Sequence, residues 1–178
     1  MKLFIATDLH GSAYYAERIV DKFNTSGADM LILLGDVYNH GPRNPFPKDY
    51  APMKVAELLN SISGKVISVR GNCDSAVDEM ISSFPFVEHD IIPLAKRRIF
   101  LTHGHVYNKR ALPALSKGDV LIYGHFHTNE CVTVKGVHCI NVSSASLPHD
   151  TSAYCIVDGD GATIYDLDDK VILTLQFN

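Results

Sequence analysis

The chain has 178 residues, of which 46% are hydrophobic and 20% are charged, and its formal net charge is −4. This is the composition of an ordinary globular protein, which excludes the disordered and fibrous classes. The length predicts a single domain over residues 1–178, large enough to bury roughly 70% of its unfolded surface. Because the charge is weakly negative and no block of lysine or arginine occurs, nonspecific binding to nucleic acid is not expected.

Neither a signal for export nor a membrane-spanning segment is expected from the sequence. The N-terminal apolar stretch reaches Asp8 almost at once, with neither a long apolar region nor a cleavage site. The four cysteines form no CxxC pair and are expected to be reduced thiols. These features predict a cytoplasmic protein without a membrane partner.

Up to residue 69 the sequence alternates between predicted strands and predicted helices. Strands are expected over residues 2–7, 30–35 and 66–69, and helices over residues 12–24 and 52–61. The first helix has a core-facing stripe of apolar side chains, formed by Ala13, Ala16, Ile19, Val20 and Phe23. This order is βαβαβ and predicts an α/β fold.

A long loop over residues 37–51 separates the second strand from the second helix. Pro42, Pro45 and Pro47 stiffen it, and it begins directly after Asp36. Long ordered loops at the carboxyl end of a strand are commonly functional, although a tolerated insertion is the alternative.

Beyond residue 84 the apolar runs become short and strand-like. Turn signals at Gly118–Asp119, Lys135–Gly136 and Asp158–Gly161 separate these runs. They predict hairpins and a second sheet, so that a mostly β half follows the βαβαβ half.

Five apolar runs each end at a residue that can bind a metal ion. Strands buried on both faces read as such continuous runs, so we expect the five to be neighbours in one sheet, with their carboxyl ends at a common edge. Open α/β sheets bind ligands at that edge. With two histidines just beyond the first and last runs, the predicted metal ligands are Asp8, His10, Asp36, Asn72, His103, His125 and His127.

The chemistry of these side chains favours a pair of metal ions. Oxygen and imidazole ligands without thiolate suit manganese, iron or zinc, and one shared carboxylate can hold two cations ~3.5 to 4 Å apart. Two divalent ions carry four positive charges, whereas Asp8 and Asp36 return two negative charges. The surplus would attract a phosphate. Any one of these residues alone would more often be an ordinary core or surface residue.

The order of the motifs resembles that of the calcineurin-like metallophosphoesterases, whose signature is D-x-H, G-D, G-N-H-D/E, H and G-H-x-H. The matching segments are Asp8-Leu9-His10, Gly35-Asp36, Gly71-Asn72-Cys73-Asp74, Thr102-His103-Gly104 and Gly124-His125-Phe126-His127. Residues 35–44 and 69–74 are also similar to the small bacterial YfcE-type phosphodiesterases, and this resemblance extends over nearly the whole chain.

The resemblance implies a β-sandwich flanked by helices and a hydrolase of phosphate esters with two divalent metal ions, often manganese. It assigns one ion to Asp8, His10, Asp36 and His127. It assigns the other to Asp36, Asn72, His103 and His125, so that Asp36 bridges the two.

Three further side chains are candidates for catalysis or substrate binding. Arg43 suits a bidentate contact with phosphate, and a solvated loop arginine is the alternative. His105 could donate to a phosphate oxygen, hold a carboxylate or simply lie in its loop. Cys73 stands where many members of the superfamily have a histidine thought to protonate the leaving alcohol, and a thiol of pKa ~8.5 is a poorer acid at neutral pH.

Other polar residues are less informative. Asp74 is expected either to orient a ligand or to cap the next helix. The segment Asn141-Val142-Ser143-Ser144 departs from the Asn-Pro-Gly-Ser that relatives tend to carry. Surface or packing roles are expected for His40, His89, His138 and His149.

Three functions compete on this evidence. The first is a phosphodiesterase that acts on a small phosphate ester through a metal-bridging hydroxide. The second is a phosphomonoesterase or a nuclease on the same site, although the lack of a basic groove argues against the nuclease. The third is a noncatalytic scaffold, as in retromer's phosphoesterase-fold subunit, but the intact ligand set argues against it. The oligomeric state stays open, with a homo-oligomer as one option.

Overall fold

The computed structural model describes residues 1–177 and begins with the predicted βαβαβ order. Its elements are β1 (Leu3–Ala6), α1 (Ala13–Ser26), β2 (Met30–Leu33), α2 (Pro52–Asn60), a short 3-10 turn η1 (Ser63–Lys65) and β3 (Val66–Val69). Ser12 caps α1 by accepting a hydrogen bond from the Tyr15 N–H, and Gly27 ends it with a left-handed φ of 68°. The predicted helices and strands of this half are confirmed, and each predicted end differs from the observed end by no more than two residues.

The second half is built almost entirely of strands. It contains α3 (Ala76–Met80), β4 (Phe86–Val87), β5 (Asp90–Leu94), β6 (Arg97–Leu101), β7 (Val120–Tyr123), β8 (Glu130–Val134), β9 (Val137–Asn141), β10 (Ala153–Val157), β11 (Gly161–Asp166) and β12 (Val171–Gln176). Within residues 1–177, every helix is too short or too polar to cross a membrane.

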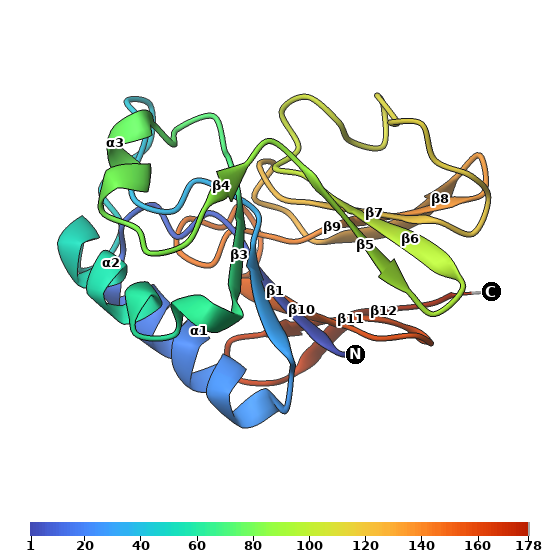
Figure 1. Ribbon diagram of the computed structural model, residues 1–178, viewed down its shortest axis with the longest axis horizontal. Coiled ribbons are helices and arrows are strands. Elements are labelled where there is room, and N and C mark those ends of the chain that lie inside the picture. Colours follow the sequence, from blue (N-terminus) through green and yellow to red (C-terminus); the bar gives the residue numbers. More distant parts are fainter. Residues whose placement is uncertain (178) are drawn as a thin grey trace.

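The strands form two sheets that pack face to face (Figure 1). One sheet has the order β12-β11-β10-β1-β2-β3-β4, and the other has the order β5-β6-β7-β9-β8. Strands β1 to β4 are parallel neighbours, whereas β10 joins β1 in the antiparallel sense. In the second sheet β6, β7 and β9 are parallel.

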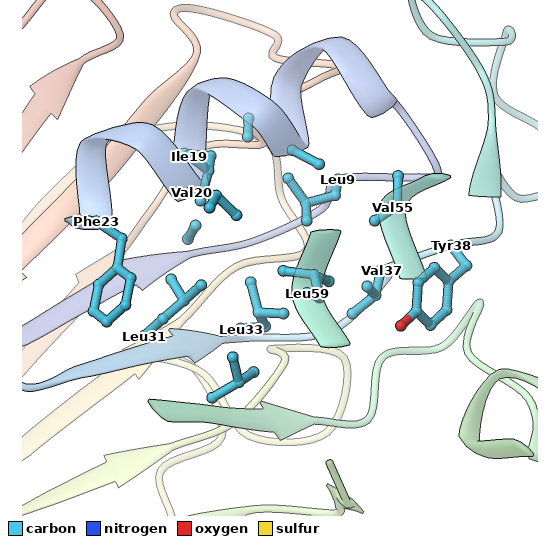
Figure 2. Packing of buried hydrophobic residues seen from close by; sticks show 14 of the residues in the cluster. Leu9, Ile19, Val20, Phe23, Leu31, Leu33, Val37, Tyr38, Val55 and Leu59 are labelled. Carbon is cyan, nitrogen blue, oxygen red and sulfur yellow. The ribbon is translucent and has the colours of Figure 1, made fainter. Parts of the chain in front are cut away.

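Two hydrophobic clusters hold these layers together. The first fills the space between the helices and the seven-stranded sheet, where Ile19 and Phe23 of α1 and Leu59 of α2 meet Leu31 and Leu33 of β2 (Figure 2). The second lies between the two sheets and includes Ile5, Ile32, Ile122, Ile140 and Cys155. Strand β2 thus buries both faces, which explains its continuous apolar run. The predicted β-sandwich flanked by helices is confirmed.

Two predictions about strand pairing are wrong. The five strands that precede metal-binding residues do not share one sheet, because β1, β2 and β3 belong to one sheet and β6 and β7 to the other. Gly118–Asp119 does not close a hairpin, because β6 and β7 are parallel and a long connection joins them. The turns at Lys135–Gly136 and Asp158–Gly161 do close the antiparallel pairs β8–β9 and β10–β11.

Candidate metal centre

The predicted ligands lie just beyond the carboxyl ends of parallel strands in both sheets. Asp8, Asp36 and Asn72 follow β1, β2 and β3 by two or three residues, and His103 and His125 follow β6 and β7 by two. Because β1, β2 and β3 run parallel in one sheet and β6 and β7 run parallel in the other, each set lies at one edge. The face-to-face packing of the sheets then brings the two sets together, with His10 and His127 two residues beyond Asp8 and His125.

Most of these residues have an unusual backbone conformation. Asp8, His10, Asp36, His125 and His127 have φ values of 54°, 47°, 53°, 68° and 54°, in the left-handed region. This conformation costs a non-glycine residue of order 1–2 kcal/mol. It turns the chain sharply after each strand and directs the side chain inward. Such strain is typical of functional sites that the surrounding structure holds in place.

The first group of ligand atoms surrounds the Asp8 carboxylate. Asp8 Oδ1 lies 3.2 Å from His127 Nε2 and 3.5 Å from His10 Nε2. The two Nε2 atoms are 3.4 Å apart, and His10 Nε2 is 3.9 Å from Asp36 Oδ2. Asp8 and His10 are fully buried, so these atoms are shielded from bulk water.

The second group lies on the other side of Asp36. His103 Nε2 is 3.5 Å from Asp36 Oδ2 and 3.0 Å from Asn72 Oδ1. His125 Nδ1 lies 3.2 Å from the same His103 atom. Asp36 Oδ2 therefore lies within 4 Å of a histidine nitrogen in each group.

Backbone carbonyls determine which ring nitrogen of three histidines faces the centre. The Nδ1–H groups of His10, His103 and His127 donate to the carbonyl oxygens of Asn39, Leu34 and Leu147, at 2.8, 2.7 and 2.6 Å. A carbonyl can only accept, so each neutral ring presents an unprotonated Nε2 to the centre. Imidazole, carboxylate and amide acceptors thus converge, and only a cation, either a metal ion or a proton, can satisfy them.

The pKa values of the first group show that protons can occupy this site in place of a metal ion. Burial alone would raise the pKa of Asp8, but hydrogen bonds with His10 and His127 bring it well below its usual value. Burial likewise opposes protonation of His10 and His127, but their contacts with Asp8 raise the pKa of both. Metal ions would have to displace these protons, so the donor set fits divalent cations that bind in exchange for protons.

Two glycines make room for the carboxylates. A Cβ on Gly71 would collide with Oδ1 of Asp36, and a Cβ on Gly124 would lie 2.7 Å from Oδ2 of Asp8. Oδ1 of Asp36 instead accepts a hydrogen bond of 2.8 Å from the Cys73 N–H, and Oδ2 of Asp8 accepts one of 3.1 Å from the His125 N–H. Each carboxylate is therefore oriented by backbone on one side and faces the centre on the other.

A cavity of about 630 Å³ opens onto the centre. Four predicted ligands, Asp36, Asn72, His125 and His127, line it, together with residues of the loops after β2 and β3 and of the segment after β9. The remaining lining residues are Asn39, Gly41, Pro42, Arg43, Asn44, Cys73 and His149.

Of the three candidates for catalysis or substrate binding, two line the cavity and one does not. Arg43 and Cys73 line it, as expected for residues that contact substrate. His105 is exposed and lies beside the centre, with its ring 5.4 Å from that of His103, but it does not line the cavity. Burial raises the pKa of the Cys73 thiol to about 12, and the Asp36 carboxylate adds to this effect.

The structure also decides the positions of His149 and Asp74. His149, expected to be a surface or packing residue, lines the cavity with its ring 5.5 Å from that of His127. Asp74 does not cap α3, because Ser75 is the N-cap and pairs with Asp78. No spacing signal marks His149 in the sequence, whereas the place of Asp74 directly after the Asn72-Cys73 pair was a signal for a role near the ligands.

Comparison with known proteins bears on this centre. Residues 1–162 match the model of the calcineurin-like phosphoesterase superfamily domain. The chain belongs to this superfamily. The family prediction is confirmed, and with it the class of enzyme, a phosphoric ester hydrolase. Phosphodiesterase YfcE of Escherichia coli (strain K12) is 46% identical over 176 residues, which cover 97% of this chain and 96% of the relative.

Solved structures agree with this assignment. A structure of YfcE, described as a phosphoesterase from E. coli, covers 100% of both chains with a TM-score of 0.97 and 44% identity. A single mutant of Vps29 from Entamoeba histolytica also covers both chains fully, with a TM-score of 0.67 and 21% identity. The latter likeness shows the fold alone.

Proposed function

We propose that this protein is a phosphodiesterase that binds two divalent metal ions per chain. One ion would be held by Asp8, His10, Asp36 and His127, and the other by Asp36, Asn72, His103 and His125. The observation that carries the proposal is the position of Asp36 Oδ2, at 3.9 Å from His10 Nε2 and 3.5 Å from His103 Nε2. A carboxylate in this position can serve both ions and reduce their mutual repulsion.

Manganese is the proposed metal, with zinc or iron as alternatives, because the ligands are oxygen and imidazole nitrogen without thiolate. When bound, two such ions would activate water as a nucleophile and stabilise the negative charge on the transferring phosphoryl group. The protein's own residues orient and enclose the ester. Asn72, His125 and His127 line the cavity, and Arg43 lines it from the loop after β2.

A diester rather than a monoester substrate is proposed on two grounds. The relative that is 46% identical is named a phosphodiesterase. The cavity of about 630 Å³ is also within the range of small-molecule sites, with room for substituents on the phosphate. The experiment is a screen of the metal-loaded protein with bis-p-nitrophenyl phosphate beside p-nitrophenyl phosphate. Preference for the monoester would contradict the proposal, and no hydrolysis of either ester by fully loaded protein would favour a scaffold.

We further propose that residues 1–178 form one metallophosphoesterase domain. Strand β10 pairs directly with β1, and β11 and β12 extend the same sheet, so the C-terminal strands complete the sheet that carries Asp8 and Asp36. The cytoplasmic location stays a prediction.

Arg43→Ala is expected to raise KM for the diester, by roughly 10-fold for the loss of one charge-assisted contact, and to leave metal content unchanged. Arg43 lines the cavity but lies in neither ligand group. Steady-state kinetics and elemental analysis measure both quantities. Arg110→Ala is the matched control, because Arg110 is exposed and outside the lining residues. Unchanged kinetics for Arg43→Ala would return this residue to a solvated loop role.

Cys73→His is expected to increase kcat/KM for alkyl diesters by about 10-fold or more and to change aryl diesters far less. A thiol with its pKa raised to about 12 is a weak proton donor, whereas an imidazole can protonate an alkoxide as it leaves. A p-nitrophenolate leaves without this help. The measurement is kcat/KM for paired alkyl and aryl diesters.

Space at Cys73 determines how clean this test is. Gly41 packs so close to Cys73 that a Cβ added to this glycine would lie 2.8 Å from the sulfur. Because an imidazole is larger than a thiol, the side chain introduced by Cys73→His must turn away from the loop after β2. The metal content of Cys73→His must therefore be compared with that of wild type, so that a change in activity is not caused by loss of metal. If Cys73→Ser abolished hydrolysis of aryl and alkyl diesters alike with both metals bound, the thiol would have a direct role that contradicts this account.

A further inference from the structure

We infer that Asp74 is a positioning residue whose carboxylate holds the loops after β2 and β3 together, so that Asp36 and Asn72 point into one centre. This inference rests on the proposed metal site. Asp74 itself does not line the cavity and belongs to neither ligand group. Its role follows from three backbone hydrogen bonds.

The carboxylate accepts three N–H groups from two different loops. Oδ2 accepts from Asp36 N–H at 2.8 Å and from Gly71 N–H at 2.7 Å, and Oδ1 accepts from Val37 N–H at 2.9 Å. Asp36 and Val37 follow β2, whereas Gly71 and Asp74 follow β3. One side chain therefore fixes the separation of the two loops that carry the bridging carboxylate and the amide ligand.

The backbone after β2 is shaped to bind an anion. Gly35 and Asp36 have φ values of 93° and 53°, and the N–H groups of Asp36 and Val37 both point to Asp74. Successive N–H groups turned to the same side form a concavity that binds negative charge. The charge of Asp74 would thus offset the strain of the left-handed conformation at Asp36, which directs the Asp36 side chain inward.

A second hydrogen bond completes the arrangement from the other direction. The N–H of Cys73, beside Asp74, donates to Oδ1 of Asp36 at 2.8 Å. Asp74 thus holds the backbone of Asp36 while its neighbour holds the side chain. Loss of Asp74 would free both loops at once, and it would leave three N–H groups without their acceptor.

An amide cannot replace this carboxylate. In Asp74→Asn one of the two acceptor oxygens becomes an NH₂ group, which would face at least one backbone N–H donor in either orientation of the amide. Partners behind metal ligands typically contribute about 10- to 100-fold to metal affinity. We therefore expect Mn²⁺ binding to weaken by at least about 10-fold in this variant.

Asp78→Asn is the matched control. Asp78 also accepts N–H and O–H groups, from Ser75 at 2.7 and 3.1 Å, but these hydrogen bonds complete the capping box of α3 and involve no predicted ligand. The experiment titrates metal-free wild type, D74N and D78N with Mn²⁺ in a calorimeter. The pH should be about 8, because burial raises the pKa of Asp74 to about 6. Melting temperatures of the metal-free proteins are compared in parallel.

The expected result is weaker Mn²⁺ binding and lower kcat in D74N, with near wild-type values of both in D78N. Mn²⁺ affinity of folded D74N within twofold of wild type would overturn the inference, and so would an equal loss in D78N. If D74N does not fold, Asp74→Glu carries the test, because it keeps the charge but displaces it by one methylene. A folded D74E with unchanged affinity would also overturn it.

The design separates this inference from the proposed function. Mn²⁺ titration needs no substrate. A wild-type protein that binds Mn²⁺ but does not hydrolyse bis-p-nitrophenyl phosphate would refute the proposed function, while the comparison of D74N with D78N would still decide the role of Asp74.

Discussion

Asp36→Asn is expected to lose at least about 100-fold in kcat, more than substitution of any ligand that serves one metal ion only. Oδ2 of Asp36 lies close to both ligand groups, at 3.9 Å from His10 Nε2 and 3.5 Å from His103 Nε2. Removing its charge leaves two divalent ions with less compensation for their mutual repulsion. Elemental analysis should therefore show depletion at both sites, beside the loss measured by steady-state kinetics.

Asp36→Asn can change metal binding and turnover without destabilising the metal-free protein. Asparagine has the same shape, and its retained oxygen can still accept the Cys73 N–H, which now lies 2.8 Å from Oδ1. Its NH₂ group would face the unprotonated nitrogens of His10 and His103 and could donate to them. We therefore expect the metal-free variant to melt no lower than metal-free wild type. Asn72→Ala serves as the comparison for one lost terminal ligand.

Two measured metals per chain with near-normal turnover in Asp36→Asn would make the bridging assignment wrong. Depletion of a single metal would contradict only the assignment of Asp36 to both ions. In that case Asp36 would belong to one ligand group, and the other ion would depend on its remaining ligands alone.

Removal of divalent metal by a chelator is expected to abolish hydrolysis and to lower the melting temperature. Metal bound only by the folded chain stabilises it by about 2.7 kcal/mol when its free concentration is 100 times Kd. For a domain of this size that corresponds to roughly 5–10 °C. The measurement pairs a thermal melt with the diester assay before chelation, after chelation and after addition of Mn²⁺, which should restore both.

Asp36→Asn provides the control for this experiment. A variant that no longer binds the ions should show little further change in melting temperature with the chelator. If wild type kept full activity with metal verified absent, the two-ion mechanism would lose its support. An equal drop in melting temperature for wild type and the variant would point to an effect of the chelator on the protein itself.

The sequence predicted which residues converge at the candidate metal centre because each one is tied to a local feature. An apolar run marks a buried strand, and the residue just after it lies at the sheet edge, whatever the neighbouring strands are. The stripe of apolar residues in α1, from Ala13 to Phe23, is equally local, and all five of its members are buried in the structure.

Strand pairing could not be predicted in the same way. The β1, β2 and β3 strands read like β6 and β7, since all are short continuous apolar runs, yet they lie in different sheets. Pairing depends on contacts between segments far apart in the chain, and nothing in an apolar run specifies its partner. The Gly118–Asp119 turn shows the same limit, because a turn signal does not reveal whether the strands around it are antiparallel.

The sequence by itself determined the chemistry of the centre: two carboxylates, an amide and four imidazoles, at positions set by strand ends. Only the tertiary structure decided how they meet. Packing of two sheets places Asp36 between two groups, and the carbonyls of Asn39, Leu34 and Leu147 orient three histidines. It also brings His149 to the cavity and Asp74 under Asp36. The physical reason is that hydrogen-bond partners and cavity walls come from distant segments, whereas the ligands themselves are marked by the residues beside them.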